Sequence, residues 1–439
     1  MYGSRGGDSA AHSKTFPRPT LSNFDLRAYL DGYKGTTKIR RAMYVAENCH
    51  ELATEGYLAA LDELEAATYN TRLHDEVSKR LEQLGVALPS KVEWRRNADQ
   101  MALRETSELT KEIDSCKSAN LVPACQKAYK KLVELNFKKG NIEEAFRTLQ
   151  AAREVGSDAE DHNELQISAA RIAQSTFRWT QVTTYVQRTR AAVTAQKGAA
   201  AWPEGTVVQL QANVGDSKWS DVARGLGELK LSESDASAVF EIGNITQRDL
   251  ALYAALSALI AMRRKDIKEK FINNLAFGKY FEAMPECLEL LKEFHASRYS
   301  TMLALLDRVL SFCVLDPVIG PHVAHIKRLI VDNIVILYST PYVTVSLEAM
   351  ARELCLASVD TLETILVRLI TTKRIVARID AVSGYLYKYK VDPRDAALAH
   401  IEKMYKSFDG HVDLLKAHIM FLEEESRRAS GPRSQRARA

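Results

Sequence analysis

The sequence lacks the patterns by which secreted, membrane and disulfide-bonded proteins are recognised. Its six cysteines are scattered without a Cys-x-x-Cys pair, and its N-terminal residues contain no apolar segment of a secretory signal. The longest nearly apolar run, residues 250–262, is shorter than the roughly 20 residues of a membrane-spanning helix. We therefore expect reduced thiols that pack as small apolar side chains, and a buried helix at residues 250–262.

Motifs that carry catalysis are also missing. The chain has no His-x-His, no phosphate-binding G-x-x-x-x-G-K-[ST] loop and no G-x-S-x-G elbow. His322 and His325 could share one face of a helix, but no Asp, Glu or Cys at ligand spacing completes a zinc site. We therefore predict no catalytic residue, no metal site and no cofactor, and assign surface or capping roles to the two histidines.

An excess of charge of one sign is absent from most of the chain. The formal net charge is +4, but residues 426–439 hold five arginines and no acid, and subtracting these five leaves −1. A dedicated nucleic-acid-binding protein would need a stronger positive field. We expect this basic tail and residues 1–21 to be disordered.

A helix, a second helix and a hairpin are predicted in this order near the C-terminal end. Ser346 and Ser358 each precede an apolar stripe at helical spacing, as N-cap residues do. Two β-prone runs follow at 375–380 and 385–390, and Gly384 between them favours a tight turn. This order of elements predicts a winged helix.

A DNA-binding winged helix is the alternative from a different functional class. The second helix would face the major groove, but it carries Asp360 and Glu363 against Arg368, and carboxylates repel the phosphate backbone. The wing does hold a group of basic residues, namely Lys373, Arg374, Arg378, Lys388 and Lys390. The acidic second helix argues against direct nucleic-acid binding and favours a protein-interaction module.

Paired helices predict a repeat architecture upstream. In residues 124–152, two amphipathic helices flank Gly140-Asn141, with Ala145 and Ala152 at positions where tetratricopeptide repeats need small side chains. Similar pairs follow at 164–193 and 207–229. Such pairs must stack to bury their apolar faces, so we expect a solenoid with an exposed binding surface.

Several longer segments carry a family resemblance. They are FDLRAYLDGYKG from Phe24, LALYAALSAL from Leu250, EFHASRYS from Glu293, GPHV from Gly320 and YSTPYV from Tyr338. With these segments the chain resembles the PCI-domain subunits of the COP9 signalosome. Within YSTPYV, Thr340 is one residue more than the signalosome form of this segment would have. A subunit of the proteasome lid or of the translation initiation factor 3 complex therefore remains an alternative.

The resemblance implies a scaffold role in a complex that removes a ubiquitin-like modifier from cullin-RING ligases. Catalysis in that family belongs to a zinc-binding subunit, and an autonomous hydrolase is the least favoured alternative. The resemblance also implies a nuclear and cytoplasmic protein whose partners are other PCI-domain subunits and cullin-RING ligase components, with no membrane partner.

The predicted fold is mainly α. A tetratricopeptide-like solenoid at 22–230 is followed by a PCI domain at 231–391, which includes the winged helix at 337–391. C-terminal amphipathic helices at 392–425 and the basic tail complete the chain.

Two partner-binding surfaces follow from the residues. Beyond the wing, an apolar stripe runs along the C-terminal helices, which we expect to be parted at Asp409-Gly410 and to pack against partner helices. The outer strand of the wing offers unpaired backbone groups to a neighbouring strand, with an aromatic face beside it. The predicted partner-binding residues are Ile375, Ile379, Tyr385, Tyr387, Tyr389, Ile401, Met404, Tyr405, Phe408, Leu415, Ile419 and Leu422.

Overall fold

The chain divides into two compact units. The computed structural model describes residues 24–86, 92–155, 159–197, 203–229, 240, 243–356, 358–388 and 393–429. The first unit runs to Tyr338 and includes residues 351–357, and the second comprises Ser339–Met350 and the residues from Ser358 onward. Each unit is described by itself.

The first unit begins with a small group of helices, α2 (Leu26–Leu30), α3 (Gly35–Asn48), α4 (Ala53–Ala67) and α5 (Thr71–Gln83). Asp25 and Asn70 accept hydrogen bonds from the first turns of α2 and α5, so both side chains act as N-caps. A Cβ atom on Gly56 would lie 2.9 Å from the carbonyl oxygen of Ala42. Glycine therefore allows α3 and α4 to pack closely.

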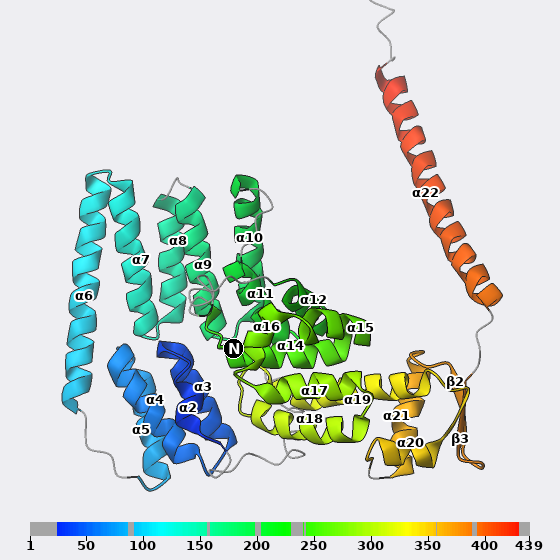
Figure 1. The fold of residues 1–439 in the computed structure, drawn as a ribbon. Coiled ribbons are helices and arrows are strands. Elements are labelled where there is room, and N and C mark those ends of the chain that lie inside the picture. The colour runs from blue at the N-terminus through cyan, green and yellow to red at the C-terminus, as the bar shows by residue number, and fades with distance from the viewer. Residues whose placement is uncertain are drawn as a thin grey trace, which may run out of the picture. The chain divides into compact units, whose positions relative to one another are not determined.

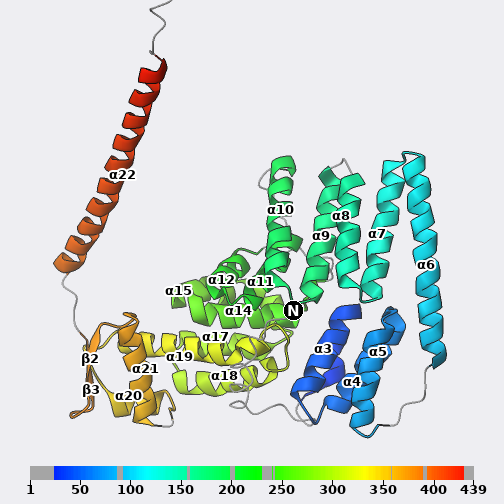
Figure 2. The same cartoon turned by 180° about the vertical axis from the view of Figure 1, so that it is seen from behind.

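Pairs of helices follow, as the repeat pattern predicts. They are α6 (Val92–Ser118), α7 (Val122–Lys138), α8 (Ile142–Val155), α9 (Ala159–Ser175), α10 (Trp179–Lys197), α11 (Pro203–Gly215) and α12 (Trp219–Glu228). Helices α6 to α10 lie side by side in chain order in both views (Figures 1 and 2). Gly140 makes the turn between α7 and α8 with a φ of +75°, and Ala145 and Ala152 are fully buried. These details confirm the predicted repeat.

The rest of the first unit surrounds one buried helix, α14 (Gln247–Ala261). Thr246 and Asp249 cap its start reciprocally, and its residues from 249 to 259 are all buried, which confirms the buried helix predicted there. Around it lie α15 (Arg264–Ile267), the π-helix η2 (Lys268–Ile272), α16 (Leu275–Phe281), α17 (Pro285–His295), α18 (Tyr299–Cys313), the 3-10 helix η3 (Gly320–His322) and α19 (Val323–Ser339). In the part of the chain that the structure describes, no helix is both long and apolar enough to cross a bilayer.

The winged helix is confirmed. It consists of β1 (Thr344–Ser346), α20 (Leu347–Glu353), α21 (Val359–Thr371), β2 (Ala377–Asp380) and β3 (Tyr385–Lys388), and α20 crosses the division between the units. Ser346 and Ser358 accept hydrogen bonds from the first turns of α20 and α21, as their positions predict. Gly384 has a φ of +71° in the hairpin turn. The antiparallel sheet has the order β1-β3-β2, so β3 is central and β1 and β2 are the edges.

One continuous helix, α22 (Pro393–Ala429), ends the described chain. The prediction of two helices parted at Asp409-Gly410 is wrong, because both residues lie within α22. A glycine inside a helix costs only about 1 kcal/mol, and the flanking residues are good helix formers that carry the helix through. Residues 426–429, expected in a disordered tail, are also helical, and residues 430–439 lie outside the described residues.

Candidate protein-interaction surfaces

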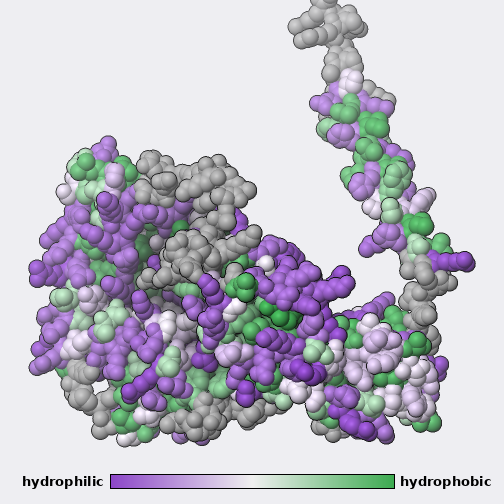
Figure 3. Space-filling model, viewed as in Figure 1, coloured by the Kyte–Doolittle hydropathy of each residue, from purple (hydrophilic) through white to green (hydrophobic). Residues whose placement is uncertain are grey.

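The apolar stripe of α22 is exposed. Seven predicted partner-binding residues are 51–68% exposed, namely Ile401, Met404, Tyr405, Phe408, Leu415, Ile419 and Leu422. Green, apolar surface recurs along this helix (Figure 3). Burying one such side chain is worth about 1.5–3 kcal/mol, so a monomer that leaves all seven in water forgoes a large stabilisation. Contiguous exposed apolar surface of this kind marks an interaction site.

A second apolar face on α22 was missed by the sequence analysis. Leu414 and Phe421 are 70% and 66% exposed, and each lies two residues from an apolar residue on the side of the stripe, half-buried Val412 and exposed Ile419. At 100° per residue, two positions correspond to 200°, which places them on nearly the opposite side of the helix. The second half of α22 is therefore apolar on two sides, which is typical of a helix that is enclosed by others. The signal in the sequence is a second set of apolar residues, Leu414 and Phe421, on the side of the helix opposite the predicted stripe.

The outer strand of the hairpin is β2, one of the two edges of the sheet, and the aromatic face belongs to the central strand β3. Tyr385 and Tyr387 are both 41% exposed, and their ring centroids lie 6.4 Å apart, whereas Leu386 between them is fully buried. Ile379 on β2 is half-buried. Ile375 is only 4% exposed, so it packs in the core and is not available to a partner, contrary to the prediction. Tyr389 lies outside the described residues.

The exposed side of α21 does not suit base recognition. Its apolar side is buried through Leu362, Leu366 and Leu369. The exposed side presents Asp360, Thr361, Thr364 and Val367. A DNA-reading helix would carry Arg, Asn or Gln on this side, so the geometry agrees with the argument made from charge.

The two histidines hold structural positions. His322 Nδ1 lies 3.0 Å from Ser217 Oγ, and its Nε2 lies 3.0 Å from the carbonyl oxygen of Gly215. Burial lowers the pKa of His322, while the Gly215 carbonyl works in the opposite direction. His325 instead lies beside Arg328, at 2.8 Å. Within the described ranges, no three His, Cys, Asp or Glu side chains gather as metal ligands.

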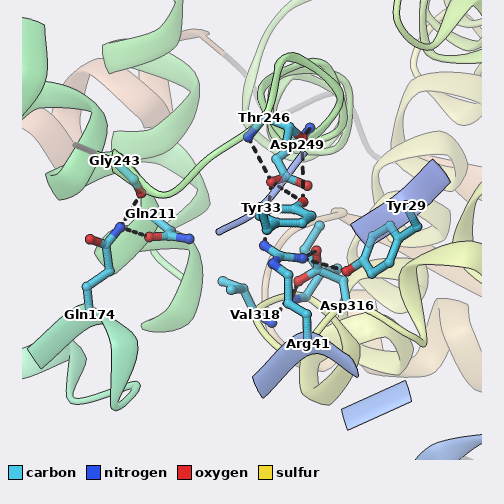
Figure 4. Close-up of polar contacts among 11 residues, drawn as sticks. Tyr29, Tyr33, Arg41, Gln174, Gln211, Gly243, Thr246, Asp249, Asp316 and Val318 are labelled. Carbon is cyan, nitrogen blue, oxygen red and sulfur yellow. Dashed lines mark hydrogen bonds and ion pairs between the residues drawn. The ribbon is translucent and has the colours of Figure 1, made fainter. Parts of the chain in front are cut away.

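A buried ionic cluster joins the two ends of the first unit, and sequence reasoning did not find it. Arg41 on α3 is 1% exposed; its Nη1 lies 2.6 Å from both Asp316 Oδ2 and Tyr29 Oη, and its Nη2 lies 3.5 Å from Asp249 Oδ2 (Figure 4). Tyr33 donates to Asp249 at 2.6 Å and places its ring 4.1 Å from the guanidinium carbon. Burial raises the pKa of Asp249, although the charge of Arg41 works against this rise.

This cluster fixes how α3 sits against α14 and against the segment that follows α18. Asp316 Oδ1 accepts from the backbone N–H groups of Val318 and Ile319, and Asp249 also accepts from that of Thr246, so both carboxylates are held from two sides. Nearby, Gln174 on α9 donates to Gln211 and to the carbonyl of Gly243 (Figure 4). Fully bonded buried polar networks rigidify the elements that they join. The first unit is thereby a firm platform for its exposed surfaces.

Comparison with known proteins gives these surfaces a family context. Residues 309–390 match the PCI domain, and residues 91–270 match the family described as 26S proteasome subunit RPN7. The chain is 28% identical to COP9 signalosome complex subunit 1 of Arabidopsis thaliana, over 94% of each protein. It is 21% identical to subunit 1b of Drosophila melanogaster (91% of this chain, 86% of the relative) and 22% identical to subunit 1 of Schizosaccharomyces pombe (83% and 84%). The chain therefore carries a PCI domain and is, over most of its length, a homologue of proteins named COP9 signalosome complex subunit 1.

Proposed function

We propose that the chain is a non-catalytic scaffold subunit of a COP9 signalosome, in which it supports the removal of a ubiquitin-like modifier from cullin-RING ligases. The isopeptidase chemistry belongs to another subunit. The names of the relatives support this proposal. The observation that carries it is the exposure of α22. Apart from half-buried Val412, each of its side chains whose burial is described is exposed.

In this proposal, α22 enters a bundle of helices from partner subunits. In the second half of α22, Val412, Leu415, Ile419 and Leu422 repeat at alternating spacings of three and four residues, as in helices that pack along a seam. The second face at Leu414 and Phe421 gives the last turns a contact on the other side.

The wing supplies a second contact in the same assembly. The outer edge of β2 offers backbone N–H and C=O groups for pairing with a strand of a neighbouring PCI subunit. Tyr385 and Tyr387 add exposed aromatic area, which interfaces favour. Cullin-RING ligase components would meet the helical repeats, and the protein would act in both nucleus and cytoplasm.

The proposal is tested by co-purification from cells that express a tagged full-length chain. Changing Ile401, Met404, Ile419 and Leu422 to Asp should release the chain from the other signalosome subunits, as read by mass spectrometry. The matched control changes four exposed residues on the opposite side of the first half of α22 to Asp, namely Ala399, Lys403, Ser407 and Gly410. Unchanged recovery of partners with the first variant, or loss with the control alone, would contradict the proposal.

A further inference from the structure

A groove in the first unit is separate from the surfaces used above. It has a volume of about 620 Å³, within the range of about 300–1,000 Å³ that is common for ligand sites. Its walls are residues 32–37 at the start of α3, Ala67-Thr68 at the end of α4, one side of α7, Leu149 of α8, one side of α9, and Asn244-Ile245 before α14. Segments that are distant in the sequence thus converge on it.

The floor of the groove is apolar. Val133, Leu149, Leu165, Ile172 and Ile245 line it, and each is at most 4% exposed. Such a floor favours an apolar side chain of the ligand, because its burial removes apolar surface from water.

The rim is basic. Four cationic side chains line the groove, Lys34, Lys130, Lys138 and Arg171, against the two carboxylates of Glu134 and Glu164. Lys130 pairs with Glu164, whereas Lys138 and Arg171 are exposed and have no ion-pair partner within the described ranges. The rim therefore has positive charge that a ligand could neutralise.

The start of α3 adds to this positive potential. Its N-cap residue, Lys34, makes no side-chain hydrogen bond to the first turn. Glu63 accepts from the backbone N–H of Gly35 at 2.8 Å and pairs with Lys38 at 3.3 Å, so part of the helix dipole is already compensated. The rim cations thus contribute more to the positive potential of the groove than the N-terminus of α3 does.

We propose that this groove binds an acidic segment of a partner protein, with a Leu- or Phe-sized side chain on the apolar floor and carboxylates facing Lys138 and Arg171. The charge complementarity and the apolar floor together select this ligand. A nucleic-acid strand suits the site less, because its phosphates and sugars offer no Leu- or Phe-sized side chain to the apolar floor. The inference goes beyond assembly through α22, and its test does not depend on it.

The test uses the full-length chain and fluorescein-labelled peptides in anisotropy titrations at about 0.15 M salt, where distant charges are screened. The probe EDLEEFDE should bind with a dissociation constant below about 1 mM. EDSEESDE, without apolar side chains, should bind at least about tenfold more weakly, and the basic peptide KKLKKFKK should not bind.

Variants of the protein locate the binding. Lys138→Glu with Arg171→Glu should weaken EDLEEFDE binding by at least about tenfold, because two attractions become repulsions. The matched control, Lys127→Glu with Lys131→Glu, makes the same charge change at exposed positions of α7 outside the groove and should leave affinity within about twofold. A thermal melt confirms that both variants fold, and Ser168→Trp, which fills the groove without changing charge, gives an independent block.

Three results would overturn the proposal. They are the absence of EDLEEFDE binding up to about 1 mM, equal weakening by the two charge-reversal pairs, and tighter groove-dependent binding of an eight-nucleotide single strand than of the peptide. Either of the first two results would mean that the groove is not a site for acidic peptides. The third would mean that the groove binds nucleic acid. None of them bears on co-purification through α22, so the two proposals fail separately.

Discussion

Arg41 Nη1 lies 2.6 Å from Asp316 Oδ2, although the two residues are 275 positions apart in the sequence. The ion pair is buried, with side-chain exposures of 2% and 5%. Because Asp249 approaches the same guanidinium, one buried cation serves two buried carboxylates. This arrangement couples the first helices of the chain to the PCI helices.

Removing the cation should destabilise the first unit strongly. Arg41→Met leaves Asp249 and Asp316 buried without their cation, and breaking a buried ion pair in this way costs about 3–5 kcal/mol. A thermal or urea melt should show the loss. The control is Arg27→Met, whose ion pair with Glu55 is long, at 3.9 Å, and largely exposed, and which should change stability by less than about 1 kcal/mol. Equal stabilities of the two variants would refute the role given to Arg41.

The turn between α7 and α8 should require glycine. Gly140→Ala adds a Cβ at a φ of +75° and places it 2.2 Å from Asn70 Nδ2, so we expect a loss of about 1–2 kcal/mol in a urea melt. Gly278→Ala is the matched control, since nothing lies within 4 Å of its Cβ position and α16 is helical there. It should be neutral or slightly stabilising, and a stabilising effect of Gly140→Ala would be incompatible with the observed turn.

Acidification should weaken the first unit through His322. Its folded pKa lies below the ordinary value because of burial, so the unfolded chain takes up the proton first as the pH falls. Stability from this residue is present above about pH 6.5 and is lost as the pH drops toward the lowered folded pKa. The melting temperature of the unaltered protein should fall as the pH is lowered from about 7.5 to about 5.5. The melting temperature of the His322→Gln variant should fall less over the same range. An identical pH dependence in both proteins would exclude this contribution.

The two faces of β3 should respond differently to substitution. Tyr385→Ser with Tyr387→Ser removes exposed aromatic area, so it should reduce recovery of a neighbouring PCI subunit and leave the melting temperature within a few degrees. Leu386→Ser, on the buried face between them, should cost about 2–5 kcal/mol of stability. If the tyrosine pair instead lowers the melting temperature as much as Leu386→Ser does, both rings belong to the local core.

Much of this fold was predictable because local signals and tertiary packing agree. In the sequence, Ser346 and Ser358 mark the starts of α20 and α21, and Gly384 marks the hairpin turn. Each residue adopts the expected geometry. Gly140 does the same for the repeat. Caps and turns depend on neighbours within a few residues, so sequence patterns report them well.

The remaining features depend on information that local patterns do not contain. The partnership of Arg41 with Asp316 arises from tertiary packing and has no periodicity. Asp409-Gly410 is a local helix-breaking signal that the longer helix overrides. Tyr385 lies on a central strand because β1, from before α20, pairs with β3 rather than leaving it at the edge. The residues of the hairpin do not by themselves show that β1, which precedes α20 and α21, pairs with β3.

Amide hydrogen exchange of α22 tests the central claim most directly. In the isolated full-length chain, the amides from Ile401 to Leu422 should exchange quickly, because the seven side chains of the stripe are exposed. After assembly with the other signalosome subunits, the same amides should become protected by at least about a hundredfold. Strong protection already in the free monomer, unchanged on assembly, would show that the chain covers this helix by itself and would contradict the scaffold account.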